Sequence, residues 1–530
     1  MVLHRAGLRA GLLGLALIGT LVAATVTVTT ATASTTANAS TTGLRLVDIT
    51  VPDGTVLKAD VIESTTPGRH PAVVFINSWG LNDAEYLAQA TTLAGHGYTV
   101  LSYTSRGWWD SGGQIDVAGP RDVADLSAVL DWLVANTTAD PARIGAAGLS
   151  YGAGIALIAA GTDARIRAVA AMSTWTDLVE SMYGNGTRRP QAVWLLKTIA
   201  DVVGRPSDEM RTMIDDYFAD RDQDQVSAWG RVRSPATYLA GINANHPAIL
   251  MANSYGDSLF APNQLVDFYN RLTGPKHLEF APGDHGVVDA TGLAGLPDPL
   301  FDSMDRWFDR YLAGATGAPA DPSVVLHRLG SDTTEGYPDW AHVSGSRPRY
   351  ALGEVRWWDG TGPLAAVAPT AGWSRTIWAG TDTTAGAGVA LLSNGLTQLT
   401  GVPPTVWLPS VSRFNAGVWE SDPLPDGAAI RGIGGLHLSI GTTEAQGTLV
   451  AYLYDVDGTE TGRLVVHAPV TWLAPTSTVD IRMPAIAYDV PAGHHLALVV
   501  DTKDPLYIDA NTSGAPVTFT GASWFDLPLR

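Results

Sequence analysis

Between about Leu44 and Gly314, short strand-like runs alternate with amphipathic, helix-like runs. Each strand-like run is rich in β-branched or small apolar residues, and apolar residues recur at helical spacing after it. The runs are PAVVFINS (71–78), YTVLSYTS (98–105), ARIGAAGLS (142–150) and IRAVAAMST (166–174). Such alternation is typical of βαβ units around a mostly parallel sheet, so it predicts an α/β domain over residues 44–314.

The alternation stops between residues 175 and 245, where helical stretches such as PQAVWLLKTIADVV follow one another. A helical insert at this point is expected to lie over the carboxyl edge of the sheet as a cap. After the small-residue linker AGATGAPADPS, residues 324–530 show short alternating runs cut by Gly, Pro and Asp. This second segment predicts an all-β sandwich or jelly roll without a long amphipathic helix.

The first 39 residues have the features of a secretory signal peptide. Arg5 and Arg9 precede an apolar run, and small residues then offer cleavage after Ala33 or Ala39. The alternative is an uncleaved membrane anchor, which the threonines from Thr25 onward disfavour. We therefore expect a secreted protein with no stable membrane insertion after processing. The chain has no cysteine, so it must fold without disulfides, and its net charge of −19 argues against nucleic acid as a partner.

The pentapeptide Gly148-Leu149-Ser150-Tyr151-Gly152 lies where the third strand-like run meets a helix-like run. G-x-S-x-G in this context is typical of a nucleophile elbow, in which a sharp strand-to-helix turn exposes the serine. Without that context, Ser150 would be an ordinary turn serine. The sequence thus predicts Ser150 as a nucleophile in an α/β-hydrolase fold.

A nucleophilic serine needs a histidine as base and a carboxylate that orients the histidine. In α/β hydrolases the acid and then the histidine follow the serine along the chain. Asp257 follows the strand-like run AILMANS, and His285 follows the next one, HLEFAPGD. Asp284 is the alternative acid, although adjacent residues rarely point at each other. Other histidines are better explained as structural or surface residues: His96, His246 and His277.

Several longer motifs resemble the X-prolyl dipeptidyl-peptidase and cocaine-esterase-like (CocE/NonD) serine hydrolases. The catalytic-domain motifs are YTSRGWWDSGG (103–113), GLSYGAG, GDSLF (256–260) and GDHG. The C-terminal motifs are VWESDPLPDG (418–427), LVAYLYDVDG (449–458) and AYDVPAGHHLAL (487–498). The resemblance implies an α/β-hydrolase fold with a helical cap insert, followed by a non-catalytic all-β jelly-roll domain. It also implies the triad Ser150, Asp257 and His285.

The resemblance implies an oxyanion hole that includes the backbone N–H of Tyr151. In the family a tyrosine hydroxyl after the third strand commonly supplies the second donor, but here Trp79 occupies that position. Either the indole N–H or the backbone N–H of Trp79 could replace the hydroxyl, because an indole is a donor only. The alternative is that Trp79 is merely part of a pocket wall.

Three further tryptophans, Trp108, Trp109 and Trp175, lie on segments expected near the site. They are candidate substrate-binding residues that would line an apolar acyl pocket, or else they pack the cap onto the sheet. In the β segment, Asp455 and Asp457 faintly resemble a calcium loop, but the full ligand pattern is missing and a turn explains them better.

Together these features predict a secreted serine hydrolase that cleaves a small ester or a short X-Pro peptide through an acyl-enzyme on Ser150. No metal and no organic cofactor are required. The alternative is a catalytically inactive cell-surface protein that binds glycans through its jelly roll. An aminopeptidase would need an acidic group for the substrate amine, and the insert offers six that the sequence does not distinguish: Glu180, Asp201, Asp208, Glu209, Asp215 and Asp216.

Overall fold

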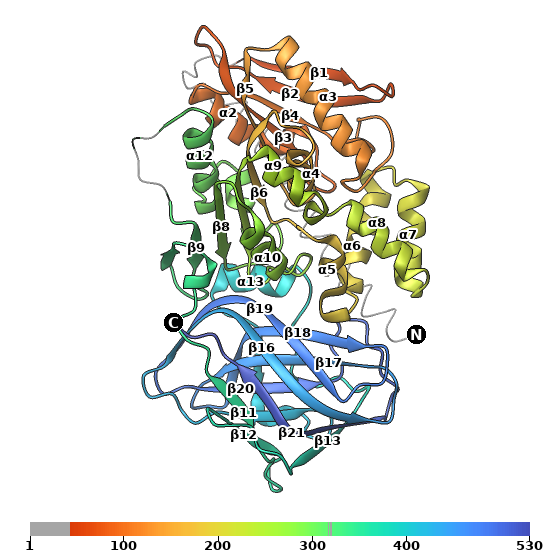
Figure 1. Ribbon diagram of the computed structural model, residues 1–530, viewed down its shortest axis with the longest axis vertical. Coiled ribbons are helices and arrows are strands. Elements are labelled where there is room, and N and C mark those ends of the chain that lie inside the picture. Colours follow the sequence, from red (N-terminus) through yellow and green to blue (C-terminus); the bar gives the residue numbers. More distant parts are fainter. Residues whose placement is uncertain (1–42, 316, 318–320) are drawn as a thin grey trace.

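The computed structural model describes residues 43–315, 317 and 321–530, so the expected signal peptide lies outside the described residues. Figure 1 shows two parts in contact: a sheet flanked by helices, and a β-rich part drawn in blue that is formed by the C-terminal residues. This arrangement confirms the predicted fold class, an α/β-hydrolase domain followed by an all-β domain.

The first sheet has ten strands in the order β1-β2-β4-β3-β5-β6-β7-β8-β9-β10. The seven strands from β4 to β9 in this order run parallel, whereas β1, β2 and β10 join the edges antiparallel. Their bounds are β1 (Leu44–Thr50), β2 (Val56–Ile62), β3 (His70–Ile76), β4 (Thr99–Tyr103), β5 (Ala139–Leu149), β6 (Ile166–Met172), β7 (Ala248–Ser254), β8 (Lys276–Ala281), β9 (Val324–His327) and β10 (Thr334–Tyr337). Parallel strands place their carboxyl ends at one edge, which is where ligands bind in such sheets.

Strands β9 and β10 differ from the expectation that residues 324–530 form the β domain alone. Leu278 of β8 pairs with Val324 of β9, and β10 then pairs with β9. The first 14 residues of that segment therefore extend the first sheet. The physical reason is that β8 would otherwise be an unprotected edge, and an adjoining strand satisfies its free backbone groups.

Helices cover both faces of this sheet, as strand β3 illustrates. Ala72, Val74 and Ile76 face one apolar core, and Val73 and Phe75 face the other. The helices on the first side are α3 (Pro120–Asn136), α4 (Ser150–Ala160) and α10 (Asn263–Arg271), and those on the second are α2 (Leu87–Gly95) and α12 (Pro299–Tyr311). Burial on both faces explains why the strand sequences read as nearly continuous apolar runs.

The insert between β6 and β7 is helical, as the sequence predicts. Its elements are α5 (Leu178–Tyr183), η2 (Gly184–Gly186), α6 (Pro190–Val203), α7 (Asp208–Ala219), α8 (Gln223–Val232), η3 (Pro235–Tyr238) and α9 (Leu239–Asn245). In Figure 1, α6, α7 and α8 stand beside the sheet as a separate helical group. Among the described residues, no helix combines the length and the apolar character that spanning a bilayer requires.

The C-terminal strands form two groups that share β12, in the path β14-β18-β17-β20-β15-β12-β11-β21-β16-β19. The first group contains β14 (Thr405–Trp407), β15 (Gly417–Glu420), β17 (Gly447–Val456), β18 (Thr461–Trp472) and β20 (His495–Asp501). The second contains β11 (Arg349–Leu352), β13 (Ser374–Trp378), β16 (Ala428–Thr442), β19 (Thr478–Val490) and β21 (Pro516–Asp526), and β12 spans Thr361–Ala365. One helix that the sequence did not predict, α13 (Leu392–Thr400), leaves this domain toward the α/β domain.

An ion pair formed by a buried arginine joins the two domains. Arg431 of β16, whose side chain is 2% exposed, donates to both carboxylate oxygens of Glu335 on β10, at 2.8 and 2.9 Å. Its remaining N–H groups donate to Asp489 at 2.6 Å and to two backbone carbonyls. All the donors of this guanidinium that the structure places are satisfied, which is the condition under which a buried charge is tolerated.

We expect Arg431→Met to lower the free energy of unfolding of the whole chain by about 2–3 kcal/mol. This loss is smaller than the roughly 3–5 kcal/mol expected when one partner of a fully buried pair is removed, because the side chains of Glu335 and Asp489 are partly exposed to solvent. Arg482→Met removes another ion pair between the domains, Arg482–Asp267, that is exposed. It should cost no more than about 1 kcal/mol. Urea denaturation measures the free energy of unfolding of both variants. Equal losses in the two variants would contradict the claim that burial makes the Arg431 ion pair the stronger one.

Candidate active site

Ser150 occupies a strained turn between β5 and α4. Its φ is 52°, in the left-handed region that side chains rarely adopt. A Cβ on Gly148 or Gly152 would come within 2.9 or 2.0 Å of the carbonyl oxygen of Ile76 in β3, so only glycine fits at either position. The two glycines thus let α4 pack against the end of β3 while Ser150 is held at the carboxyl edge of the sheet.

Ser150, His285 and Asp257 form a continuous hydrogen-bonded row at this edge. Ser150 Oγ lies 2.9 Å from His285 Nε2, and His285 Nδ1 lies 3.0 Å from Asp257 Oδ2. Asp257 follows β7 and His285 follows β8, as expected from the sequence. Because a carboxylate only accepts, Nδ1 donates to Asp257, and Nε2 is left to accept the Ser150 proton.

The surroundings of His285 favour its protonated form. Burial lowers the pKa of His285, but the carboxylates of Asp257, Asp284 and Asp289 raise it, and the net pKa lies above the usual 6.5. The other oxygen of Asp257 accepts from the backbone N–H groups of Leu259 and Phe260, at 2.9 and 2.6 Å. Phe260 also packs its ring edge-on against the imidazole, so the acid and the histidine are both held in place.

Asp284, the alternative acid, does not contact the imidazole ring. Its Oδ1 accepts from the backbone N–H groups of Ser258 and His285, at 2.8 and 2.7 Å. Asp284 therefore joins the two loops that carry Asp257 and His285, a contact that its position in the sequence does not reveal. Burial, together with the nearby Asp257, raises the pKa of Asp284 to about 6.

The other histidines have structural surroundings. His277 lies 2.9 Å from the Pro322 carbonyl and 3.2 Å from Glu279. His96 and His246 end helices α2 and α9. These three side chains are therefore not brought to Ser150.

The indole N–H of Trp79 is not free for an oxyanion, because it donates to the Leu196 carbonyl of α6 at 2.9 Å. This corrects one of the two roles expected for Trp79. The physical reason is that α6 of the insert lies over the loop and brings the Leu196 carbonyl within hydrogen-bond distance of the indole. The backbone N–H groups of Trp79 and Tyr151 have no hydrogen-bond partner among the described residues. Ser78 beside them is held by the buried Glu85, which accepts from the Ser78 backbone N–H at 2.7 Å.

Only one of the three candidate substrate-binding tryptophans lines the cavity at Ser150. Trp175 does so, with 3% of its surface exposed and its ring 4.9 Å from that of Phe260. Trp108 is fully buried behind Trp79, and Trp109 is 39% exposed and donates to a backbone carbonyl. The correction follows from a tight turn after β4, in which Gly112 pairs with Val56 of β2 while the backbone N–H of Trp109 donates to the Val203 carbonyl at the end of α6.

The suspected calcium loop is a turn. Asp457 Oδ1 accepts from the backbone N–H groups of Thr459 and Thr461, at 2.9 and 3.3 Å. Asp455 accepts from the Tyr488 hydroxyl and lies 2.8 Å from His494 Nδ1. Because these carboxylate oxygens already accept hydrogen bonds from the protein, this loop is better described as a turn than as a calcium site.

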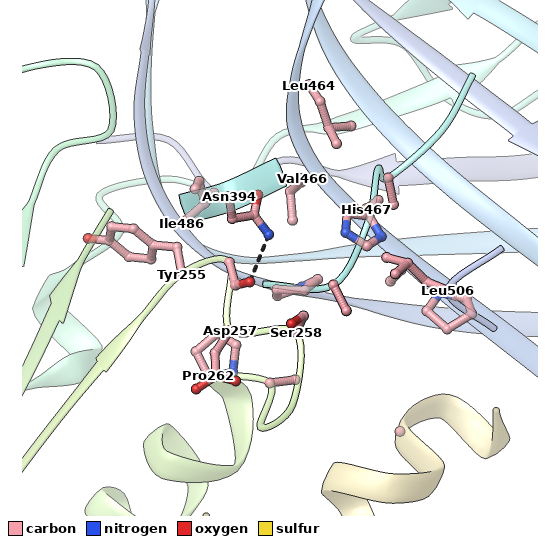
Figure 2. A pocket seen from close by; sticks show the side chains of 18 of the residues that line it. Tyr255, Asp257, Ser258, Pro262, Asn394, Leu464, Val466, His467, Ile486 and Leu506 are labelled. Atoms are coloured by element: carbon pink, nitrogen blue, oxygen red, sulfur yellow. Dashed lines mark hydrogen bonds between the residues drawn. The ribbon is translucent and has the colours of Figure 1, made fainter. Parts of the chain in front are cut away.

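The C-terminal domain reaches the catalytic loops through α13. Figure 2 shows Asn394 on this helix beside Asp257 and Ser258, in a cavity between the domains that is also lined by His467 and Leu506. Asn394 Nδ2 donates to the Gly256 carbonyl at 2.8 Å. The Leu391 backbone N–H donates to Ser258 Oγ at 3.1 Å. The loop of Asp257 is thus held from both domains, a contact that no sequence motif signals.

An elbow serine in an α/β sheet, hydrogen-bonded to a histidine and an acid, defines a serine hydrolase of the α/β-hydrolase class. Comparison with known families then identifies which one. The model of the X-Pro dipeptidyl-peptidase (S15 family) matches residues 53–287, and that of the X-Pro dipeptidyl-peptidase C-terminal non-catalytic domain matches residues 382–524. The chain belongs to this family of serine hydrolases, as the sequence motifs predicted.

Solved structures share this architecture over nearly the whole chain. An α-amino acid ester hydrolase is 16% identical with a TM-score of 0.71, covering 94% of this chain and 99% of that one. A CocE/NonD family hydrolase from Staphylococcus aureus is 12% identical with a TM-score of 0.69, covering 94% and 98%. The uncharacterized protein YcjY of Escherichia coli K12 is 25% identical over 258 residues, covering 40% of this chain and 81% of that protein. The structural similarity establishes the fold.

We expect Asn394→Ala to lower kcat by about tenfold with little change in KM, because the loop of Asp257 loses a hydrogen bond and small displacements of catalytic groups are costly. Thr400→Ala is the matched control, since Thr400 ends the same helix and its side chain bonds only to Leu396 and to Val402 just beyond the helix. Steady-state kinetics and thermal melting measure both variants. A fall in melting temperature without a fall in kcat would contradict a positioning role.

Proposed function

We propose that this serine hydrolase cleaves carboxylic esters or amides through a covalent acyl-enzyme on Ser150. The observation that carries the proposal is the Ser150–His285–Asp257 row, with heavy-atom separations of 2.9 and 3.0 Å. His285 Nε2 would take the proton of Ser150 Oγ as the oxygen attacks the substrate carbonyl carbon. The imidazolium would then protonate the leaving alcohol or amine as its bond to the acyl carbon breaks.

Hydrolysis of the acyl-enzyme would use the same groups in reverse. His285 would take a proton from water as the water oxygen attacks the acyl carbon, and it would return that proton to Ser150 Oγ as the acid leaves. Asp257 would hold the imidazole orientation throughout and stabilise its positive charge. The raised pKa of His285 makes it a stronger base for both steps.

The negative charge that develops on the carbonyl oxygen requires hydrogen-bond donors. We assign this role to the backbone N–H groups of Tyr151 and Trp79. Tyr151 is the second residue of α4, directly after the nucleophile, where the helix dipole also favours an anion. The Trp79 backbone N–H is the remaining donor of that residue because its indole is committed to Leu196.

The relatives suggest small substrates, since their names include an ester hydrolase and an aminopeptidase. Esters and short peptides are therefore the substrates to test first. The alternative of an inactive glycan-binding protein is not favoured, because a protein without catalysis has no need to retain a strained serine hydrogen-bonded to a histidine.

We expect Ser150→Ala and His285→Ala each to lower kcat for p-nitrophenyl esters by at least about 1,000-fold, to a similar residual level. The two residues act as a unit, so losing either one removes the same step. A fluorophosphonate probe should label the unaltered chain at Ser150, as peptide mass spectrometry would report. A folded Ser150→Ala variant that keeps more than a tenth of the activity would refute the assignment.

Trp79→Phe completes the same series by testing the oxyanion assignment. It keeps both backbone donors, so kcat should fall by less than about tenfold. Loss of a true oxyanion donor costs about 100- to 1,000-fold. A loss in that larger range would indicate that the indole, and not the backbone, stabilises the charge.

We also propose that the protein is exported, on the strength of the basic and apolar residues before Ala33 and Ala39. Expression of the full chain should release a protein whose N-terminus is near Ser34 or Ser40. Sequencing the N-terminus of the secreted material measures this. Recovery of a chain that begins at Met1 in the membrane fraction would show an uncleaved anchor instead.

A further inference from the structure

The cavity that reaches Ser150 extends into the helical insert, and its empty space, together with the adjoining open solvent, amounts to about 830 Å³. We call it the insert cavity. None of the side chains that form its walls carries a formal charge. The walls are formed by Trp79, Val117, Ser150, Tyr151, Trp175, Leu178, Val179, Met182, Tyr183, Val193, Leu196, Met210, Met213, Ile214, Tyr217, Val226, Trp229, Gly230 and Phe260.

With the exception of Trp229 Nε1, the polar side-chain atoms of these aromatic walls already have partners. The indole N–H groups of Trp79 and Trp175 donate to backbone carbonyls at 2.9 and 2.7 Å, and the Tyr217 hydroxyl donates to another at 3.2 Å. Trp229 Nε1 has no partner among the described residues, but it is a donor and cannot accept from an ammonium group. The cavity therefore has no evident acceptor for a cationic substrate.

The six acidic residues of the insert that could have bound a substrate amine lie elsewhere. Asp201 pairs with Lys197 at 2.6 Å, Asp216 with Arg221 at 2.7 Å, and Glu209 lies 3.6 Å from Arg233. Glu180 lines the separate cavity between the domains, and Asp208 and Asp215 are exposed to solvent. None of the six lines the insert cavity.

One buried acid contacts the wall from behind. Asp122, which is 1% exposed, accepts a hydrogen bond from the Tyr151 hydroxyl at 2.6 Å. Burial, with the like charge of Asp116 adding to it, raises the pKa of Asp122 to about 8. Near neutral pH this carboxyl is therefore largely uncharged, and Tyr151 separates it from the cavity.

We propose that the insert cavity binds the acyl group of the substrate and that this group is apolar and uncharged. The proposal rests on the proposed acyl-enzyme mechanism, in which the acyl carbon becomes bonded to Ser150 Oγ and the alcohol leaves with a proton from His285. An acyl group with a free α-ammonium, as in an aminoacyl ester or an X-Pro dipeptide, would lose its hydration without gaining a counter-charge. Such substrates are therefore excluded, although the family is named for an X-Pro dipeptidyl-peptidase.

The test compares the p-nitrophenyl esters of phenylacetate and phenylglycine, which differ only in the α-ammonium group. Each kcat/KM is divided by the rate constant for uncatalysed hydroxide hydrolysis, because the ammonium group also activates the ester chemically. At a pH where the amine is protonated, the normalised value for phenylacetate should exceed that for phenylglycine by about 100-fold or more. The gap should narrow as the pH rises and the amine loses its charge, and Ala-Pro-p-nitroanilide should not be cleaved.

A pair of variants isolates the effect of charge at the cavity wall. Met213 lines the cavity and is 4% exposed, and Met213→Glu and Met213→Gln introduce side chains of similar size. The preference for phenylacetate should be at least about tenfold smaller in Met213→Glu than in Met213→Gln. If the variants do not fold, the comparison of substrates with the unaltered chain still decides the question.

Two results would overturn the proposal, and they can be told apart. In the first, the enzyme is active and is labelled at Ser150 by a fluorophosphonate, but it hydrolyses the phenylglycine ester as well as or better than the phenylacetate ester. This result would refute only the exclusion of substrates with a free amine and would leave the acyl-enzyme mechanism intact. A chain that hydrolyses neither ester and is not labelled at Ser150 would refute the acyl-enzyme mechanism and, with it, this proposal.

Discussion

The contact of Gly148, at the end of β5, and Gly152, in the first turn of α4, with the end of β3 determines the geometry of the site. Gly148 and Gly152 leave no room for a Cβ beside the Ile76 carbonyl, and this closeness holds Ser150 at a φ of 52°. The strained turn places the serine at the carboxyl edge of the sheet and directs the first N–H groups of α4 toward the same point. His285 and Asp257 reach it from the ends of neighbouring strands because β7 and β8 run parallel. The hydrogen-bonded row therefore depends on this one close approach.

The C-terminal domain helps to hold the catalytic loops in place through direct contacts with the α/β domain. Asn394 and Leu391 donate to the loop of Asp257, and the buried Arg431 forms an ion pair with Glu335 of the edge strand β10. The insert contributes in a different way, since its helix α6 accepts the indole N–H of Trp79 and its apolar side chains complete the cavity at Ser150. Two elements outside the core sheet thus define what the triad can contact.

Much of the fold and the triad could be predicted from the sequence. Strand–helix alternation follows from local periodicity, and an elbow followed by Asp257 and His285 after successive strands follows from chain order. These signals depend only on local residue spacing and on the order of residues along the chain, so they can be recognised without a structure. The all-β character of the C-terminal domain was predicted for the same reason, whereas the assignment of residues 324–337 to the first sheet was missed because strand pairing is a non-local choice.

Tertiary structure alone decided the direction in which each side chain points. Trp108, Trp109 and Trp175 were equal candidates for the cavity wall in the sequence, yet only Trp175 of the three lines the insert cavity, because a turn directs the other two away from it. The same holds for the acids of the insert, of which none lines the insert cavity once the helices are packed. Sequence determined which chemical groups this chain has and in what order. Packing determined which of them share a surface, because contacts between distant segments depend on three-dimensional fit and not on spacing along the chain.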